Sequence, residues 1–474
     1  MFEKIFKLKE NGSDVKTEVL AGLTTFMTMA YIIALNPNLL TNWDSGSDLW
    51  KGVFLATCVA SSIGMFVMAF LANKPFAMAP GMGLNAFFAV VVGNIAGITG
   101  LTYLESFQAA LCIILVEGII FIILSVFKIR EKIVDAIPLG VRMGIAPAIG
   151  LMIMNIGFGS NVGIYSSTGG PFYVMRDFFG SLSAGYAKTT MGEGYSKMVL
   201  TAVTMLIGLF VIIILSAKGF KFSVIVGMLV SSVIYWVADA AFLKEDPFGA
   251  IKGASWLPPF KEMAETTLFK FDFPDFFKIG WATALTLIIT FCLIDMFDTI
   301  GTLVGTAERA GMLDKDGKMP KMKEALLADA IGTVSGACTG TSTVTTFIES
   351  ASGVEAGGRT GLTALTTGIM FLLCMFISPI AAVIPAAATS AALIYVGILM
   401  LSGLKNVHFD NFEESVPVSL MLLAMPISGS IGHAIGIGLI AFTVIKLFTG
   451  KAKDVSVLTY ILSVIFLVKF FAAI

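Results

Sequence analysis

Apolar runs of about 20 residues follow one another from Thr17 to the end of the chain, and they constrain its fold more than any other feature. A helix of that length crosses the roughly 30 Å hydrocarbon core of a bilayer with its backbone polar groups satisfied internally. Only 13% of the 474 residues are charged, against roughly 25% in soluble proteins. The sequence therefore predicts an all-α, polytopic membrane protein with no soluble domain of useful size.

These runs divide into about fourteen predicted spans, several of them short or broken. The predicted spans cover residues 17–40, 51–73, 80–98, 103–127, 137–157, 197–216, 220–242, 278–305, 323–339, 341–357, 360–378, 384–403, 413–428 and 430–449. A further apolar stretch at 454–473 crosses the membrane, lies in its interface or packs outside the bundle.

The distribution of lysine and arginine predicts the orientation of the chain. With the N-terminus inside, the basic connections fall on the cytoplasmic side, as the positive-inside rule requires, and the long connections at 157–196 and 243–278 fall outside. We expect a multi-pass protein of the cell (inner) membrane, with the N-terminus and the region of residue 450 in the cytoplasm. The basic residues expected inside are Lys128, Arg130, Lys132, Arg142, Lys218, Lys221, Arg309, Lys315, Lys318, Lys321, Lys323, Lys446, Lys451 and Lys453.

Short motifs recur in the same order in the two halves of the chain. Thr25-Phe26 matches Thr290-Phe291 at an offset of 265, and Asn85 stands where Glu349 stands 264 residues later. Ile137-Pro138 and Gly150 recur together at an offset of 247, as Ile384-Pro385 and Gly397. A repeat of seven plus seven spans would be inverted in the membrane, because seven is odd.

Two spans at corresponding places in this repeat are interrupted. Pro80, Gly81 and Gly83 break the third span, and a Gly- and Thr-rich stretch breaks the tenth at residues 339–346. We expect a short strand in each, followed by half-helices that begin near Leu84 and Phe347. Such paired interruptions indicate the substrate site of a secondary transporter.

The apolar eighth span carries two carboxyl groups, Asp295 and Asp298, on roughly one helix face. A charged Asp at the bilayer centre costs about 2.5–3.5 kcal/mol on insertion scales. No lysine or arginine in the apolar run Leu285–Val304 offsets this cost, so we expect a protonated carboxyl or a wet cavity, and proton uptake coupled to substrate binding. The alternative is a structural role, in which Asp298 only caps or bonds a neighbouring helix.

The broken spans contribute Glu349, expected in the first turn of its half-helix, and Asn85. Both are candidate ligands, although either could simply cap its helix. Asn85 offers a donor and an acceptor together, which suits a neutral, planar solute better than a simple ion.

Other polar residues are better explained without a ligand. Glu117 and Asp329 are expected to bond between helices, and His408 and His433 have no partner at metal-ligand spacing. The five cysteines are scattered through apolar segments, as small core residues are. No metal, cofactor or nucleic acid is expected. An intramembrane enzyme is disfavoured, because no HExxH or GxSxG motif stands in a suitable context.

Several long motifs are similar to those of the AzgA-like purine permeases of the nucleobase–cation symporter-2 group. They are Thr17–Phe26, Ala79–Phe88, Asp295–Thr299, Gly340–Gly353 and Ala356–Thr363, and the resemblance runs nearly end to end. It implies a fourteen-span fold shared with uracil permeases, with a core domain (1–127 and 278–378) and a gate domain (128–243 and 379–474). Members of the family commonly form homodimers.

The same resemblance implies proton-coupled import of adenine, guanine or hypoxanthine. Asp295 and Glu349 would bind the base, and Asn85 would support the pocket. Thr346 would offer a hydroxyl and Phe347 an aromatic face. Asp295, Asp298 and Glu349 would carry the proton, although carboxyl groups also serve sodium. The alternative is an anion or other small-solute carrier on the same fold. A channel is disfavoured, because the pattern offers no continuous pore lined by polar residues.

Overall fold

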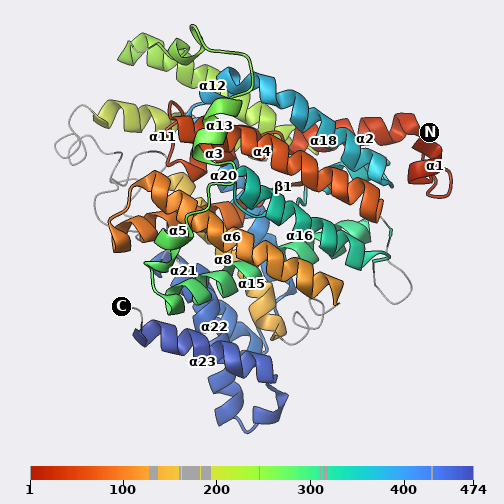
Figure 1. Cartoon of the computed structure of the whole chain (residues 1–474), viewed down its shortest axis with the longest axis vertical. Helices are drawn as coiled ribbons and strands as arrows, with labels where there is room; N and C mark the ends of the chain where they lie inside the picture. The colour runs from red at the N-terminus through yellow and green to blue at the C-terminus, as the bar shows by residue number, and fades with distance from the viewer. Residues whose placement is uncertain are drawn as a thin grey trace. The chain divides into compact units, whose positions relative to one another are not determined.

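A computed structural model describes residues 2–127, 137–159, 162, 182, 194–244, 246–309, 311–312, 319–428 and 431–472. Helices make up most of these residues (Figure 1). Five basic residues expected on the cytoplasmic side lie outside the described part of the chain, as does most of the predicted 157–196 connection. These five are Lys128, Arg130, Lys132, Lys315 and Lys318.

Eleven helical segments of the described chain are long and apolar enough to cross a membrane, so the protein is a multi-pass membrane protein. Three predicted spans are not among them. α16 (Met322–Thr339) carries three charged residues, and α21 (Phe412–Ser428) has 17 residues and begins beside two glutamates. The tenth predicted span contains only a three-residue strand and a six-residue helix. The count of fourteen and the seven-plus-seven repeat therefore stay predictions.

The chain forms two compact units, each built from two stretches that are far apart in sequence. Unit 1 comprises Met1–Val134 and Ala254–Ala382, and unit 2 comprises Asp135–Gly253 and Val383–Ile474. The elements of unit 1 are α1 (Phe2–Phe6), α2 (Val15–Met29), α3 (Ile32–Leu40), α4 (Asp48–Val67), η1 (Met68–Ala72), β1 (Met78–Pro80), α5 (Met82–Thr99), α6 (Tyr103–Val126), α13 (Phe260–Thr266), α14 (Phe273–Phe277), α15 (Trp281–Arg309), α16, β2 (Val344–Thr346), α17 (Ser350–Glu355), α18 (Gly361–Leu373), η4 (Cys374–Ile377) and α19 (Ser378–Ala382).

Local sequence signals set several helix ends in unit 1. Asp14 caps α2 by accepting a hydrogen bond from the Thr17 N–H, and Thr102 forms a capping box with Glu105 at α6. At the other ends, Gly100 closes α5 and Gly340 closes α16 with left-handed backbone, which glycine adopts without steric cost.

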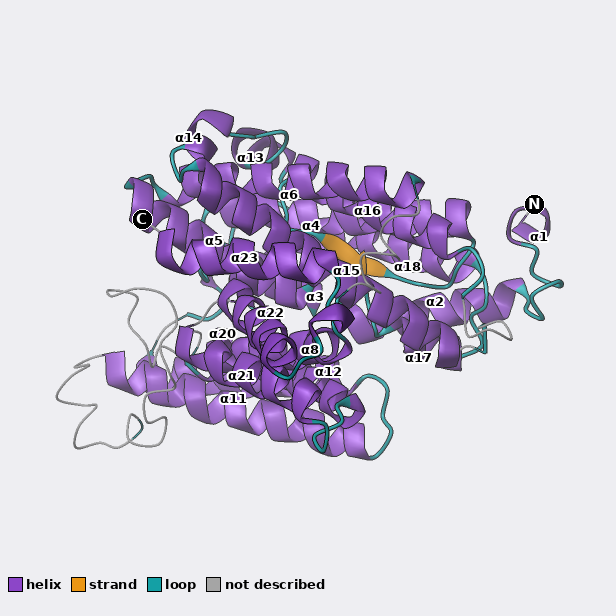
Figure 2. Ribbon diagram, turned by 90° about the horizontal axis from the view of Figure 1, so that it is seen from below, coloured by secondary structure: helices purple, strands orange, loops and turns teal. Residues whose placement is uncertain are grey.

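Strands β1 and β2 pair antiparallel, with Ala79 opposite Thr345 in the register. Figure 2 shows the pair in orange among the helices of unit 1. α16 packs closely against the segment before β2, because Gly336 has no side chain. A Cβ at Gly336 would lie 2.5 Å from the Ser342 carbonyl oxygen. Both strands are fully buried. The backbone polar groups of this irregular segment are thus partly satisfied by the two-stranded pairing.

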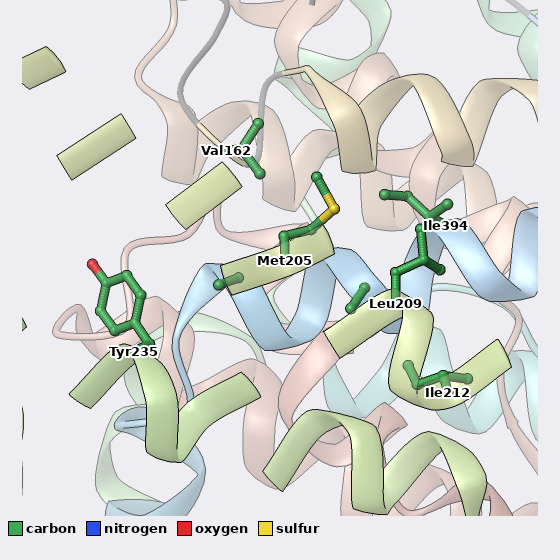
Figure 3. Packing of buried hydrophobic residues seen from close by; sticks show 8 residues of the cluster. Val162, Met205, Leu209, Ile212, Tyr235 and Ile394 are labelled. Carbon is green, nitrogen blue, oxygen red and sulfur yellow. The ribbon is translucent and has the colours of Figure 1, made fainter. Parts of the chain in front are cut away.

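Unit 2 contains long apolar helices and the C-terminal helix. A cluster of buried side chains from α11, α12 and α20 forms part of its core, including Met205, Tyr235 and Ile394 (Figure 3). The elements are α8 (Leu139–Phe158), α11 (Gly194–Ala217), α12 (Ser223–Ala238), η2 (Asp239–Leu243), η3 (Gly249–Ile251), α20 (Ala386–Leu401), η5 (Ser402–Asn406), α21, α22 (Ile431–Phe448), η6 (Ala452–Asp454) and α23 (Val457–Ala472).

Two glycines that correspond in the predicted repeat touch each other in unit 2. α8 follows its N-cap Pro138 and α20 follows its N-cap Pro385, as the offset of 247 anticipates. A Cβ on Gly150 would lie 2.7 Å from the Gly397 carbonyl oxygen, and a Cβ on Gly397 would lie 2.7 Å from that of Gly150. This reciprocal contact is what a local two-fold relation between α8 and α20 would produce.

Candidate functional site

The broken spans meet in unit 1 at the β1–β2 pair. β1 leads through Gly81 into α5, and β2 leads through residues 347–349 into α17. The Gly81 N–H donates to the Thr343 carbonyl at 3.0 Å, and the Phe347 N–H donates to the Ala77 carbonyl at 2.9 Å. The sequence predictions need correcting in detail, because α5 begins at Met82 and α17 only at Ser350. With six residues, α17 also has a smaller dipole than a full half-helix would have.

Asp295 lies on α15 and is fully buried. The Thr299 hydroxyl lies 3.0 Å from Asp295 Oδ1, 3.0 Å from Asp329 Oδ1 and 2.7 Å from the Thr345 hydroxyl. One hydroxyl therefore joins the eighth predicted span, α16 and β2. Asp329, which the sequence suggests is structural, shares this hydroxyl with the principal candidate ligand.

Glu349 is the N-cap of α17 rather than a residue of its first turn, and its side chain caps no helix N–H. It is partly exposed. Its Oε1 accepts a hydrogen bond from the Tyr31 hydroxyl at 2.7 Å, across 318 residues of sequence. The capping alternative for Glu349 is therefore wrong, and the bond reaches instead to the first span.

Asn85 is buried and has protein partners at both ends of its amide. Its Nδ2 donates to the Pro80 carbonyl at 3.1 Å, and its Oδ1 accepts from the Ser342 hydroxyl. This geometry links the two interrupted segments to each other. The Thr343 hydroxyl, one residue before β2, donates to Glu117 Oε2 at 2.8 Å. Glu117 on α6 thus bonds to the interrupted tenth span, whereas the sequence predicts a bond between helices.

Asp298 is half-buried and lies beside the break in the third span. A Cβ on Gly81 would be 3.7 Å from Asp298 Oδ2. No described residue forms a hydrogen bond with its carboxyl group, so the interhelical bond weighed for Asp298 is not seen in the described part of the chain. This carboxyl therefore lies close to the point where the third predicted span is interrupted.

Thr346 and Phe347 end the strand segment and are both buried. The Thr346 hydroxyl has no hydrogen-bond partner among the described residues. An unsatisfied buried hydroxyl costs free energy, and a ligand that bonds to it would remove that cost.

Several phenylalanines near the broken spans pair with one another. Phe87 packs on Phe291 with ring centres 4.7 Å apart, and Phe26 meets Phe371 edge-on at 5.8 Å. These contacts describe core packing, which the sequence already favours for most of them.

Away from the site, the His408 ring bonds Glu414 at 3.1 Å. Within the described residues, no three His, Cys, Asp or Glu side chains are grouped as a metal site.

The sequence analysis does not identify two residues of the candidate site, Tyr31 and Thr299. Tyr31 stands where the first span breaks between α2 and α3, and Thr299 follows Asp295 by one helical turn. A hydroxyl one turn from an intramembrane Asp is a usable sequence signal for Thr299. No local pattern points to Tyr31, since its partner lies 318 residues away.

Comparison with known proteins gives consistent results along the whole chain. The model of the permease family matches residues 16–446. The adenine permease AdeP of Escherichia coli K12 is 37% identical over 469 residues, covering 99% of this chain and 96% of that protein. The guanine/hypoxanthine permease PbuO of Bacillus subtilis is 37% identical over 470 residues, covering 98% and 100%.

Among solved structures, the transmembrane domain of the cyanobacterial bicarbonate transporter BicA has a similar fold. Its TM-score is 0.64 at 15% sequence identity, covering 88% of this chain and 96% of that one. At this identity the likeness shows the fold alone.

Proposed function

The chain belongs to the permease family as an AzgA-like purine permease, a transporter rather than an enzyme, and on that premise we propose that it imports purine nucleobases by proton symport. The substrates would be adenine, guanine or hypoxanthine, as the names of the two relatives suggest. The observation that best supports this site is the Thr299 hydroxyl, which joins Asp295, Asp329 and Thr345. Thr345 lies four residues before Glu349 on the same segment.

In this proposal the base lies beside the β1–β2 pair of unit 1. Asp295 and Glu349 accept hydrogen bonds from its N–H groups, because ionised carboxylates only accept. The unpartnered Thr346 hydroxyl serves a ring nitrogen or carbonyl, and Phe347 packs on the ring. Asn85 does not contact the base in this proposal. It supports the pocket, because its amide already bonds to both broken segments.

Hydrogen-bond counting at Thr299 supports a stored proton. A hydroxyl has one proton to donate, yet two carboxyl groups lie about hydrogen-bond distance from this one. A proton on Asp295 or Asp329 would let one carboxyl donate while the other accepts. We propose that Asp295, Asp298 and Glu349 take part in proton coupling, with Asp329 as the partner of Asp295.

Transport would follow by alternating access. We propose that unit 1 is the substrate-carrying core and unit 2 the gate, and that the core moves against the gate as a rigid body, in an elevator or rocking motion. The fourteen-span inverted repeat, the cytoplasmic N-terminus and a homodimer belong to the same proposal. Anion carriage on this fold is the second candidate, but the named permease relatives do not favour it.

Initial uptake of labelled adenine, guanine, hypoxanthine and uracil in a transport-deficient cell tests the proposal. We expect saturable purine uptake that collapses with a protonophore and survives replacement of sodium by choline. Uptake that follows sodium instead would reject proton coupling and keep the substrate class. No purine uptake by protein shown to be in the membrane would reject the function, and bicarbonate and sulfate would be tested next.

A further inference from the structure

Tyr31 lies between two helices of the first predicted span, after α2 ends at Met29 and before α3 begins at Ile32. Its side chain is 3% exposed, and its hydroxyl donates to Glu349 Oε1 at 2.7 Å. A buried tyrosine hydroxyl normally finds a partner, but a backbone carbonyl would serve that need. This one is directed at a carboxylate that stands at the end of the interrupted tenth span.

Tight packing between α2 and α17 determines where these two groups meet. A Cβ on Gly353 would lie 2.0 Å from the Thr25 hydroxyl oxygen and 2.8 Å from the Ala21 carbonyl oxygen, so only glycine fits there. Gly353 is one helical turn after Glu349, and Thr25 is six residues before Tyr31. The two segments thus run antiparallel, and their contact ends at the Tyr31–Glu349 bond.

The bond restricts a side chain that would otherwise be loosely held. Glu349 has three rotatable side-chain bonds, and its carboxylate caps no helix N–H. A phenol is a suitable restraint because it is neutral, so the carboxylate keeps its charge, and because it occupies one oxygen and leaves Oε2 for another donor.

We propose that Tyr31 is a positioning residue for substrate. Its hydroxyl holds the Glu349 carboxylate in the orientation that receives an N–H group of the purine base on Oε2. The first span thereby contributes to a site that the sequence assigns to the third, eighth and tenth. This inference rests on the proposed function, because it takes Glu349 to be a substrate ligand.

The test compares Tyr31→Phe with Tyr103→Phe, measuring the uptake KM and Vmax for whichever purine the unmodified protein transports. Tyr103 is a matched control, since its hydroxyl also makes one hydrogen bond, to the Leu40 carbonyl at 2.8 Å. We expect KM to rise on the order of tenfold in Tyr31→Phe, as loss of a hydrogen bond to a charged group predicts, with Vmax within about threefold. Tyr103→Phe should leave KM unchanged.

A rescue variant separates positioning from packing. Replacing Tyr31 by 4-aminophenylalanine keeps the ring and restores an N–H donor at the same place, so KM should return to within about threefold of the unmodified value. An unchanged KM in Tyr31→Phe, or equal losses in the phenylalanine and aminophenylalanine variants, would overturn the positioning role. If the unmodified protein transports no purine, the proposed function itself fails, which is a different result from purine transport that ignores Tyr31.

Discussion

Glu18 and the carboxylates near β2 both belong to unit 1 but accept hydrogen bonds from different sets of donors. Glu18 on α2 is fully buried and accepts hydrogen bonds from the Arg359 N–H at 2.9 Å, the Thr360 N–H at 3.2 Å and the Thr363 hydroxyl at 2.5 Å. The first two donors lie just before α18, and Thr363 is the third residue of that helix. Glu18 therefore accepts hydrogen bonds from the segment that leads into α18.

The carboxylates near β2 meet hydroxyl groups that can rotate. Asp295 and Asp329 share the Thr299 hydroxyl, and Glu349 receives the Tyr31 hydroxyl. Backbone N–H groups are fixed in direction and only donate, whereas a hydroxyl can donate or accept by turning. Two of the three donors to Glu18 are backbone N–H groups, which favours a structural role, whereas the hydroxyl donors near β2 suit the exchange of a proton or a ligand that we propose there.

The largest expected effect comes from removing one of the carboxyl groups near β2. Asp295→Ala should lower purine uptake at least a hundredfold, because both a substrate contact and a proposed proton site are lost, while the protein still reaches the membrane. Asp295→Asn is the companion variant, and it should still bind purine but lose the dependence of uptake on the proton gradient. Normal proton-coupled uptake in Asp295→Ala would break the comparison.

Glu18→Ala should act on stability instead. It leaves the N–H groups of Arg359 and Thr360, just before α18, without this acceptor, and we expect a loss on the order of 3 kcal/mol in the free energy of unfolding. Thermal unfolding in detergent and the amount of folded protein would report it. The fraction that folds should show an ordinary purine KM, and a large change in KM without a loss of stability would assign Glu18 to the site.

Thr346→Val sharpens the contrast within the site. Its hydroxyl has no partner among the described residues, so an isosteric methyl should leave stability unchanged or slightly raised. We expect KM for purine to rise about three- to tenfold, as loss of one neutral hydrogen bond to a ligand predicts. A fall in thermal stability with no change in KM would show that the hydroxyl serves the fold.

The smallest effect concerns Asp14, a capping carboxylate in water. Its acceptance of the Thr17 N–H holds the pKa of Asp14 below its ordinary value. Because the folded pKa is the lower one, the stabilisation is present at neutral pH and is lost as the pH falls through about 4 and below. The melting temperatures of unmodified protein and Asp14→Ala should differ slightly at pH 7, and the difference should shrink as the pH is lowered below 4. A constant difference would show that the charge is not involved.

Sequence reasoning located the interruptions of the third and tenth predicted spans, but not the hydrogen bonds that the side chains form there. The interruptions around Gly81 and residues 339–346 are visible because glycine, proline and threonine conflict with continuous helix. The half-helix boundaries differ by two or three residues: α5 begins at Met82, before the expected Leu84, and α17 begins at Ser350, after the expected Phe347. The sequence predicts a span at residues 323–339. In the described chain, α16 is not among the helices that are long and apolar enough to cross a membrane, because it carries three charged residues.

The sequence by itself determined that the chain spans a membrane many times and where its spans break. It also showed that Asp295 and Glu349 are carboxyl residues within predicted membrane spans. These are properties of composition and short-range order, and the cost of polar groups in lipid makes them conspicuous. Only the tertiary structure decided which donor each carboxylate meets: the segment from Arg359 to Thr363 for Glu18, a shared hydroxyl for Asp295 and Tyr31 for Glu349. A hydrogen bond acts over about 3 Å, so its partner depends on how distant segments pack, and no local pattern encodes that.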